Sequence, residues 1–176
     1  MHLKKNVILG FFVLILFIGT ILTSCGGNNM HPVKALNNFS KLIEKGNLDD
    51  LSLTIYYIDP STCTLKPLSI DELLNMENVK KIVVKSNELK EHIDLLNKIN
   101  SDAITPVKDK PRIDARVYYV FETKKGGKIF SVAMWGEDNS IFVNDVAVKD
   151  DDVFYNAIIP FVPEDIVKEL NPYINK

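Results

Sequence analysis

The spacing of hydrophobic residues changes along the chain between a helical and a strand-like period, and each change marks a new element. Apolar residues recur at helical spacing over 32–44, where Pro32 suits the first turn and Gly46 suits the C-terminal stop. Strand-like apolar runs occupy 51–58 and 79–85. This first part of the pattern therefore predicts one helix and two strands.

Two further helices are predicted around the second of these strands. Ser69 and Glu72 form a capping box, in which each residue satisfies a free backbone amide of the other. The box predicts a short helix over 69–76. Apolar residues on one face predict a longer helix over 86–100, capped by one of its first two residues.

The clearest strand signal is strict alternation over 112–123, with one apolar face made by Ile113, Ala115, Val117, Tyr119 and Phe121. The elements that follow are a turn at 124–127, a strand at 128–135, a turn at 137–140, a strand at 141–143, the two-residue turn Asn144-Asp145 and a strand at 146–148. One of the aspartates at 150–152 then caps a helix that runs to 159, and a last short helix is predicted at 165–170.

These elements predict an α+β fold, in which a meandering antiparallel sheet packs against helices on one face. If the strand at 112–123 is regular, Tyr118 and Tyr119 must face opposite sides of the sheet. One of them then belongs to the core, while the other lies on an open sheet face. Tyr118 and Trp135 are the candidates for a binding surface on that face; packing under the C-terminal helices is the simpler interpretation.

The N-terminus carries a different pattern, because Lys4 and Lys5 precede an almost wholly apolar run over residues 7–22. This run of 16 residues is shorter than the roughly 20 that a membrane-spanning helix needs. Positive charge, then a short apolar segment, then small residues is typical of an export signal.

Leu22, Thr23, Ser24 and Cys25 follow the apolar run and resemble the lipobox of bacterial lipoproteins at all four positions. The resemblance implies a diacylglyceryl thioether on the Cys25 sulfur and cleavage before Cys25 by the lipoprotein signal peptidase. Two acyl chains anchor a protein stably where one does not. A plain N-terminal membrane helix with an incidental cysteine is the alternative.

The lipobox divides the chain into three parts. Residues 1–24 are the expected signal peptide, 25–31 the lipidated cysteine with a polar tether, and 32–176 a single α+β domain on the extracytoplasmic face of the cell membrane. The order of elements over roughly 50–165 also resembles small uncharacterised lipoproteins of Gram-positive bacteria. That resemblance implies no activity and no functional residue.

Charge and cysteine content narrow the classes of function. Removal of residues 1–24 leaves 19 basic against 23 acidic residues, so the formal charge falls from −2 to −4 and no basic surplus favours nucleic acid. Cys63 is the only other cysteine, so no disulfide is expected in a processed chain, and an inert thiol is the simplest interpretation. We expect no cofactor and no metal; the aspartates at 150–152 suit a helix N-terminus better than a calcium loop.

The sequence therefore predicts a lipid-anchored, non-enzymatic domain that binds a protein, a peptide or another envelope component. Its oligomeric state is left open. The alternative is a small envelope hydrolase that uses His92 with a carboxylate such as Glu137 or Asp138. His92 lies beside the apolar face of its predicted helix, where a structural role at the core boundary is the simpler interpretation.

Replacement of Cys25 by alanine tests the anchor. Cys25→Ala is expected to abolish metabolic labelling with a fatty acid and to leave the precursor uncleaved, because the thiol that carries the lipid is gone. Electrophoretic mobility and in-gel detection of the lipid measure both effects. Cys63→Ala is the matched control and should be labelled and processed normally; labelling of Cys25→Ala would contradict the lipobox.

Overall fold

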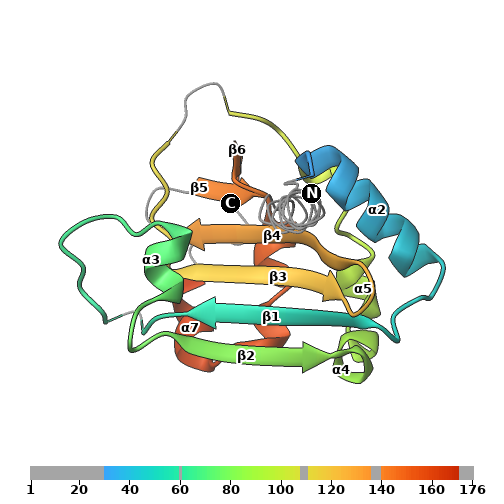
Figure 1. Cartoon of the computed structure of the whole chain (residues 1–176), viewed down its shortest axis with the longest axis horizontal. Helices are drawn as coiled ribbons and strands as arrows, with labels where there is room; N and C mark the ends of the chain where they lie inside the picture. The colour runs from blue at the N-terminus through green and yellow to red at the C-terminus, as the bar shows by residue number, and fades with distance from the viewer. Residues whose placement is uncertain (1–29, 60, 108–110, 136–139, 171–176) are drawn as a thin grey trace, which may run out of the picture.

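The fold is built on one six-stranded antiparallel sheet with the strand order β2-β1-β3-β4-β5-β6 (Figure 1). The computed structural model describes residues 30–59, 61–107, 111–135 and 140–170. The strands are β1 (Leu51–Tyr57), β2 (Lys80–Lys85), β3 (Val117–Thr123), β4 (Gly127–Trp135), β5 (Ser140–Val143) and β6 (Val146–Val148). The predicted meander is confirmed for β3 to β6, while β1 lies between β2 and β3.

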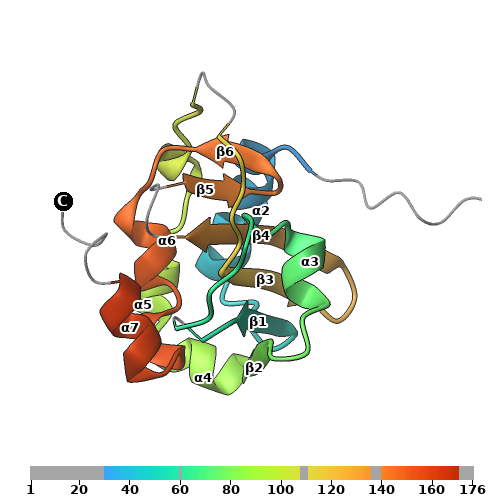
Figure 2. The same cartoon turned by 90° about the vertical axis from the view of Figure 1, so that its left-hand side faces the viewer.

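Helices cover both faces of this sheet, but unequally. They are α2 (Pro32–Glu44), α3 (Ile70–Leu74), α4 (Ser86–Glu91), α5 (Ile93–Leu96), α6 (Asp152–Asn156) and α7 (Glu164–Leu170), with short 3-10 turns at Ser101–Ala103 and Ile159–Phe161. Figure 2 shows α5, α6 and α7 on one side of the sheet and α3 on the other. The predicted α+β class is confirmed, whereas the expectation that all helices share one face is wrong for α3.

The sheet face that is opposite α3 carries the larger hydrophobic cluster, which is the main core. Aromatic packing fixes α2 against this core. The ring of Phe39 lies 4.8 Å from that of Phe121 and 5.1 Å from that of Phe130, measured between ring centroids. All three side chains are fully buried. Aromatic pairs at such distances add to the free energy that burial of their area already supplies.

The predicted glycine stop of α2 is confirmed in detail. Gly46 has a φ of +66°. Its amide donates to the Ile43 carbonyl at 2.9 Å, and the Asn47 amide donates to the Leu42 carbonyl at 3.2 Å. This is the Schellman motif. A left-handed residue after the helix lets its own amide and the next amide bond to carbonyls of the last helical turn.

The helix predicted over 86–100 is interrupted at His92, whose φ of −117° and ψ of 28° are not helical. The chain forms α4 and α5 instead, and each contributes a fully buried leucine, Leu89 and Leu96, to the main core. Lys85 occupies the N-cap position, not either of the first two residues of the predicted helix. Glu88 accepts a hydrogen bond from the Lys85 amide at 3.5 Å.

The strand predicted over 112–123 begins only at Val117, and the alternation of faces changes at Arg116. Val117 belongs to the main core, but Ala115 packs with the apolar residues beneath α3 on the other face. The Ala115 amide donates to the Leu68 carbonyl at 2.8 Å, so the chain pairs at Ala115 with the segment before α3. Tyr119 and Tyr118 lie on opposite faces, as predicted.

The predicted turn at Asn144-Asp145 is confirmed as a two-residue hairpin with φ values of +47° and +67°. The Asn144 side chain is almost fully buried at 3% exposure. Its Oδ1 accepts from the Ser131 amide at 2.9 Å, and its Nδ2 donates to the Met30 carbonyl at 2.8 Å. Asn144 therefore joins β4, β5 and the segment that leads into α2.

The expected signal peptide and tether up to residue 29, including Leu22, Thr23, Ser24 and Cys25, lie outside the described residues. The expected turn at 137–140 lies outside them as well, except for Ser140. Among the helices that are described, none is long and apolar enough to cross a membrane.

Substitutions of Asn144 separate its side-chain bonds from its backbone conformation. Asn144→Gly keeps the left-handed turn but leaves the buried Ser131 amide unpaired, so the free energy of unfolding should fall by roughly 1–3 kcal/mol. Asn144→Ala should cost about 1 kcal/mol more, because alanine disfavours positive φ. Urea denaturation measures both. Asp145→Gly keeps the Asn144 side chain and relieves the positive φ at residue 145, so it should change the free energy of unfolding less than Asn144→Gly does. An unchanged stability of Asn144→Gly would contradict the role of the side chain.

Candidate functional site

The candidate site lies on the sheet face that α3 covers, and α3 forms one side of the site. Ser69 is the N-cap of α3, and its hydroxyl accepts from the Glu72 amide at 3.2 Å while Glu72 accepts from the Ser69 amide at 2.8 Å. The predicted capping box is thus present. Leu68 and Leu73, one residue before the cap and four after it, are both buried beneath the helix and hold it against the sheet.

Two residues of the floor, Tyr118 and Phe142, lie in one row across adjacent strands, with Ala133 between them. Tyr118 of β3 pairs with Ala133 of β4, and Ala133 pairs with Phe142 of β5. Tyr118 is 9% exposed and Ala133 is fully buried. Tyr118 and Phe142 line the site, whereas Ala133 is covered by its neighbours.

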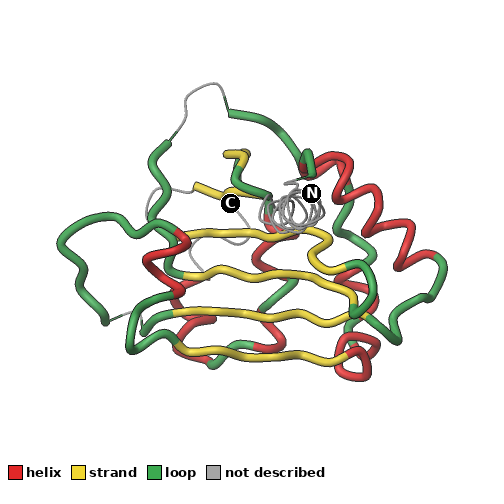
Figure 3. The backbone as a smooth tube through the Cα atoms, viewed as in Figure 1, coloured by secondary structure: helices red, strands yellow, loops and turns green. Residues whose placement is uncertain are grey.

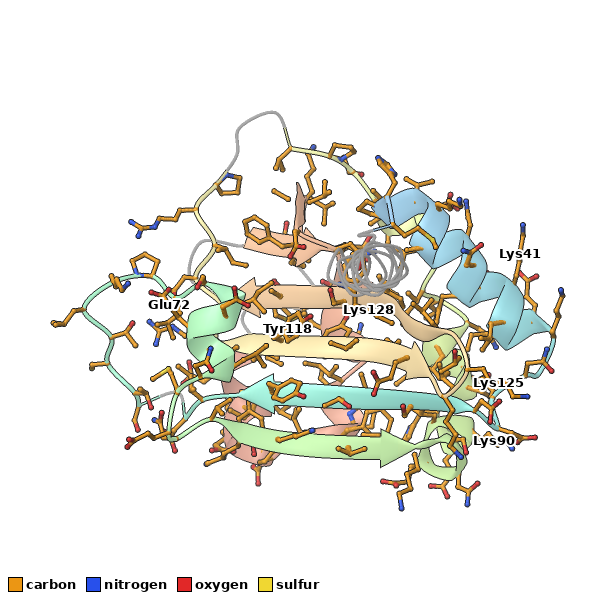
Figure 4. The ribbon with its side chains drawn as sticks, viewed as in Figure 1. Lys41, Glu72, Lys90, Tyr118, Lys125 and Lys128 are labelled. Carbon is orange, nitrogen blue, oxygen red and sulfur yellow. The ribbon has the colours of Figure 1, made fainter. Side chains whose placement is uncertain are left out.

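A groove of about 510 Å³ lies between α3 and strands β3 to β5, and this volume is within the range of small-ligand sites. Apolar and charged side chains both line it: Ser69, Ile70, Asp71, Leu74, Ile113, Tyr118, Lys128, Phe142 and Asp145. Figure 4 labels Tyr118 and Lys128 on the sheet face that α3 covers, with Glu72 on α3 itself. Such a surface suits a ligand with an apolar part and a polar or charged part.

An arginine fork holds the loop that leads into α3. Arg116 donates to the Thr62 carbonyl at 3.1 Å and to the Thr64 hydroxyl, and its Nε lies 3.1 Å from Oδ1 of Asp114. The same Asp114 oxygen accepts from the Leu68 amide at 2.8 Å. The Arg116 side chain is only 11% exposed. This ion pair therefore fixes both ends of the loop over 61–68, which projects beyond the strand ends in Figure 3.

Two groups around the groove have shifted acidities. Burial raises the pKa of the Tyr118 phenol, so its hydroxyl stays protonated over the physiological range. The ion pair with Lys66, followed by the bonds from the Ser69 amide and hydroxyl, lowers the pKa of Glu72 to about 2. The Glu72 side chain is 39% exposed and is bonded to Lys66 and Ser69, so this shift describes a charged cap and not a catalytic carboxylic acid.

The site includes one of the two predicted surface residues. Tyr118 forms its floor, as expected of a residue on the second face of the sheet. Trp135 is the last residue of β4, and its side chain lies outside the described set. The groove residues Lys128, Phe142 and Asp145 were not predicted, because alternation assigns a face to a residue but does not reveal what will cover that face.

His92, the residue of the hydrolase alternative, lies away from the groove. Its ring contacts Phe161 edge to face, with centroids 5.1 Å apart. Within the described part of the chain its side chain has no hydrogen bond or ion pair, while Glu137 and Asp138 lie outside that part. The arrangement favours the structural role that the sequence suggested.

The other reactive residue types have local structural roles or stand apart from the groove. Cys63 is exposed in the loop over 61–68. Asp151 is the N-cap of α6, where it accepts from the Val153 amide at 3.0 Å, as expected for one of the three aspartates. Among the described residues, no three His, Cys, Asp or Glu side chains lie where they could hold a metal ion. The Ser69 hydroxyl, which reaches the groove, is engaged by Glu72.

No protein-family model, curated protein or solved structure matches this chain.

Replacement of the Arg116 guanidinium tests whether Arg116 holds the loop over 61–68. Arg116→Lys keeps the charge but loses the planar set of donors, so local opening should become easier by roughly 1–2 kcal/mol, or about 5- to 30-fold. Hydrogen exchange of the amides over 61–68 measures this. Arg112→Lys, at the only other arginine, is the matched control because Arg112 is exposed. Equal exchange in Arg116→Lys and wild type would contradict the assignment.

Proposed function

We propose that this protein is a lipid-anchored bacterial binding module that displays the α3 groove on the extracytoplasmic side of the cell membrane. Its ligand is a peptide segment of an envelope protein, and Cys25 carries the anchor. The observation that carries the binding role is the groove itself, which has a formed apolar floor and charged groups at its margin. The lipobox sequence supports the location.

The shape and chemistry of the groove favour recognition over catalysis. Its floor is built on three paired strands, and one wall is a helix with a complete capping box, so the site is preorganised. Preorganisation lowers the entropy lost on binding. Ile70, Leu74 and Phe142 offer apolar contact, while Lys128 and Asp145 supply charges of both signs. A peptide that combines an apolar side chain with polar backbone groups matches this lining.

The start of the described chain supports a groove close to the anchor. The Met30 carbonyl accepts a hydrogen bond from the Asn144 side chain, and Asp145, the residue after Asn144, lines the groove. Met30 lies five positions after Cys25, and a fully extended chain spans at most about 18 Å over five such steps. A lipid on Cys25 would therefore keep the groove near the bilayer surface, where it meets membrane proteins or newly exported chains.

Site-specific photo-crosslinking in intact cells tests this proposal. A photoreactive amino acid at Asp71, on the rim of the groove, should give a discrete adduct, whereas one at Asn37, exposed on α2, should not. Leu74→Asp, which places a charge in the groove, should remove the adduct at Asp71 because an apolar ligand part would lose its contact. Immunoblotting detects the adducts, and circular dichroism of the purified variant checks its fold.

Two outcomes would contradict the binding role of the groove. One is equal adducts at Asp71 and Asn37, which indicates random collision. The other is an adduct that persists in a folded Leu74→Asp variant. Loss of the adduct in Cys25→Ala alone bears on the anchor and not on the groove.

A further inference from the structure

The two edges of the sheet are treated differently by the fold. The outer edge of β6 is covered by residues 105–107, which form a bridge between Pro106 and Val148. The Lys149 amide donates to the Thr105 carbonyl at 2.8 Å, and the Val107 amide donates to the Ala147 carbonyl at 3.5 Å. The chain therefore uses its own backbone to close this edge.

The opposite edge is formed by β2, which pairs with β1 over all six of its residues. Among the described residues, no backbone hydrogen bond joins 80–84 to any segment except β1. In Figure 1 this strand forms the lower margin of the sheet. An edge strand presents a row of backbone donors and acceptors that another extended chain can pair with.

The side chains of this edge are basic. Lys80, Lys81 and Lys85 are all exposed, and Val83 between them is 50% exposed, an unusual value for a large apolar residue here. Lys80 lies 3.7 Å from Asp59, while the Lys81 ammonium lies over the Tyr56 ring at 5.3 Å from its centroid. The edge is thus locally positive in a chain whose formal net charge is −2.

This charge discriminates between possible occupants of the edge. A second copy that paired symmetrically about Ile82 and Val83 would set Lys80 of one chain opposite Lys85 of the other. Like charges directly opposite each other destabilise a strand pair. An acidic strand would instead place carboxylates beside these lysines.

We propose that the β2 edge is a docking site for an extended acidic segment of another protein, which adds to the sheet as a further strand. Backbone pairing supplies affinity, and the lysines select for acidic sequences. Repulsion between the same lysines disfavours pairing of two copies of this chain. The lysines therefore both oppose self-association and select an acidic partner. The site is separate from the α3 groove and depends on neither its ligand nor the lipid anchor.

Synthetic peptides test the proposal with the full chain in detergent micelles. The probe is acetyl-Thr-Glu-Val-Glu-Val-Glu-Thr-amide, and its twin carries lysine in place of each glutamate. Two further versions of the acidic peptide carry backbone N-methyl groups, either on every glutamate or on every valine. Each version blocks hydrogen bonding along one edge of the peptide only, because successive amides of a strand point to opposite sides. Fluorescence anisotropy measures binding.

The acidic peptide should bind and the basic twin should not. One N-methylated version should lose binding and the other should keep it, which simple charge attraction cannot produce. Lys81→Glu combined with Lys85→Glu should weaken the acidic peptide about tenfold, since two opposite-charge contacts become repulsive. Lys34→Glu combined with Lys98→Glu makes the same charge change at exposed sites elsewhere and should have little effect.

Three results would overturn the proposal. The first is no binding of the acidic peptide at millimolar concentration, which would leave the lysines with a protective role only. The second is equal binding of the two N-methylated versions, which would indicate charge attraction without strand pairing. The third is an equal loss of binding in the two double variants.

Discussion

The constraint on which this structure depends is that one sheet has to bury apolar side chains on both of its faces. β3 carries Tyr119 and Phe121 toward the main core, and Tyr118 toward the opposite side. Most helices cover the first face, so the second depends on α3 and the segments beside it. Placing so short a helix requires anchors outside the helix, because five residues form too few internal hydrogen bonds to be stable alone. Its capping box, the buried pair Leu68 and Leu73, and the ion pair of Arg116 with Asp114 provide them.

The groove is a consequence of this partial cover. α3 spans only part of the second face, so a groove lined by Tyr118 and Phe142 remains between this helix and strands β3 to β5. The walls are fixed by interactions that do not involve a ligand, chiefly the capping box and the arginine fork. A preformed site of this kind is typical of binding proteins. The proposed anchor and the proposed acidic strand on β2 would add two further attachments, each at a different place on the sheet.

Local chemistry predicted many of the elements. The glycine stop of α2, the capping box of α3 and the hairpin turn at Asn144 and Asp145 all depend on neighbours within a few residues, and each appeared where it was expected. The opposite orientation of Tyr118 and Tyr119 likewise follows from strand alternation. Prediction was wrong where a distant segment decided the conformation. The Leu68 carbonyl accepts a hydrogen bond from the Ala115 amide, and the strand predicted from residue 112 begins only at Val117. The helix predicted over 86–100 divides at His92, although Leu89 and Leu96, seven positions apart, share one face of a continuous helix as well.

The sequence by itself determined the class of fold, the positions of most helices and strands, and the alternation of faces within β3, where Tyr118 and Tyr119 lie on opposite sides. These properties follow from spacing and capping, which act over one or two turns of chain. Only the tertiary structure decided that α3 crosses to the second face, that Lys128 and Asp145 join Tyr118 around one groove, and that one sheet edge is covered while the other is left open. Each of these depends on contacts between residues far apart in the chain, such as the 46 positions between Leu68 and Asp114, and no local pattern encodes such a distance.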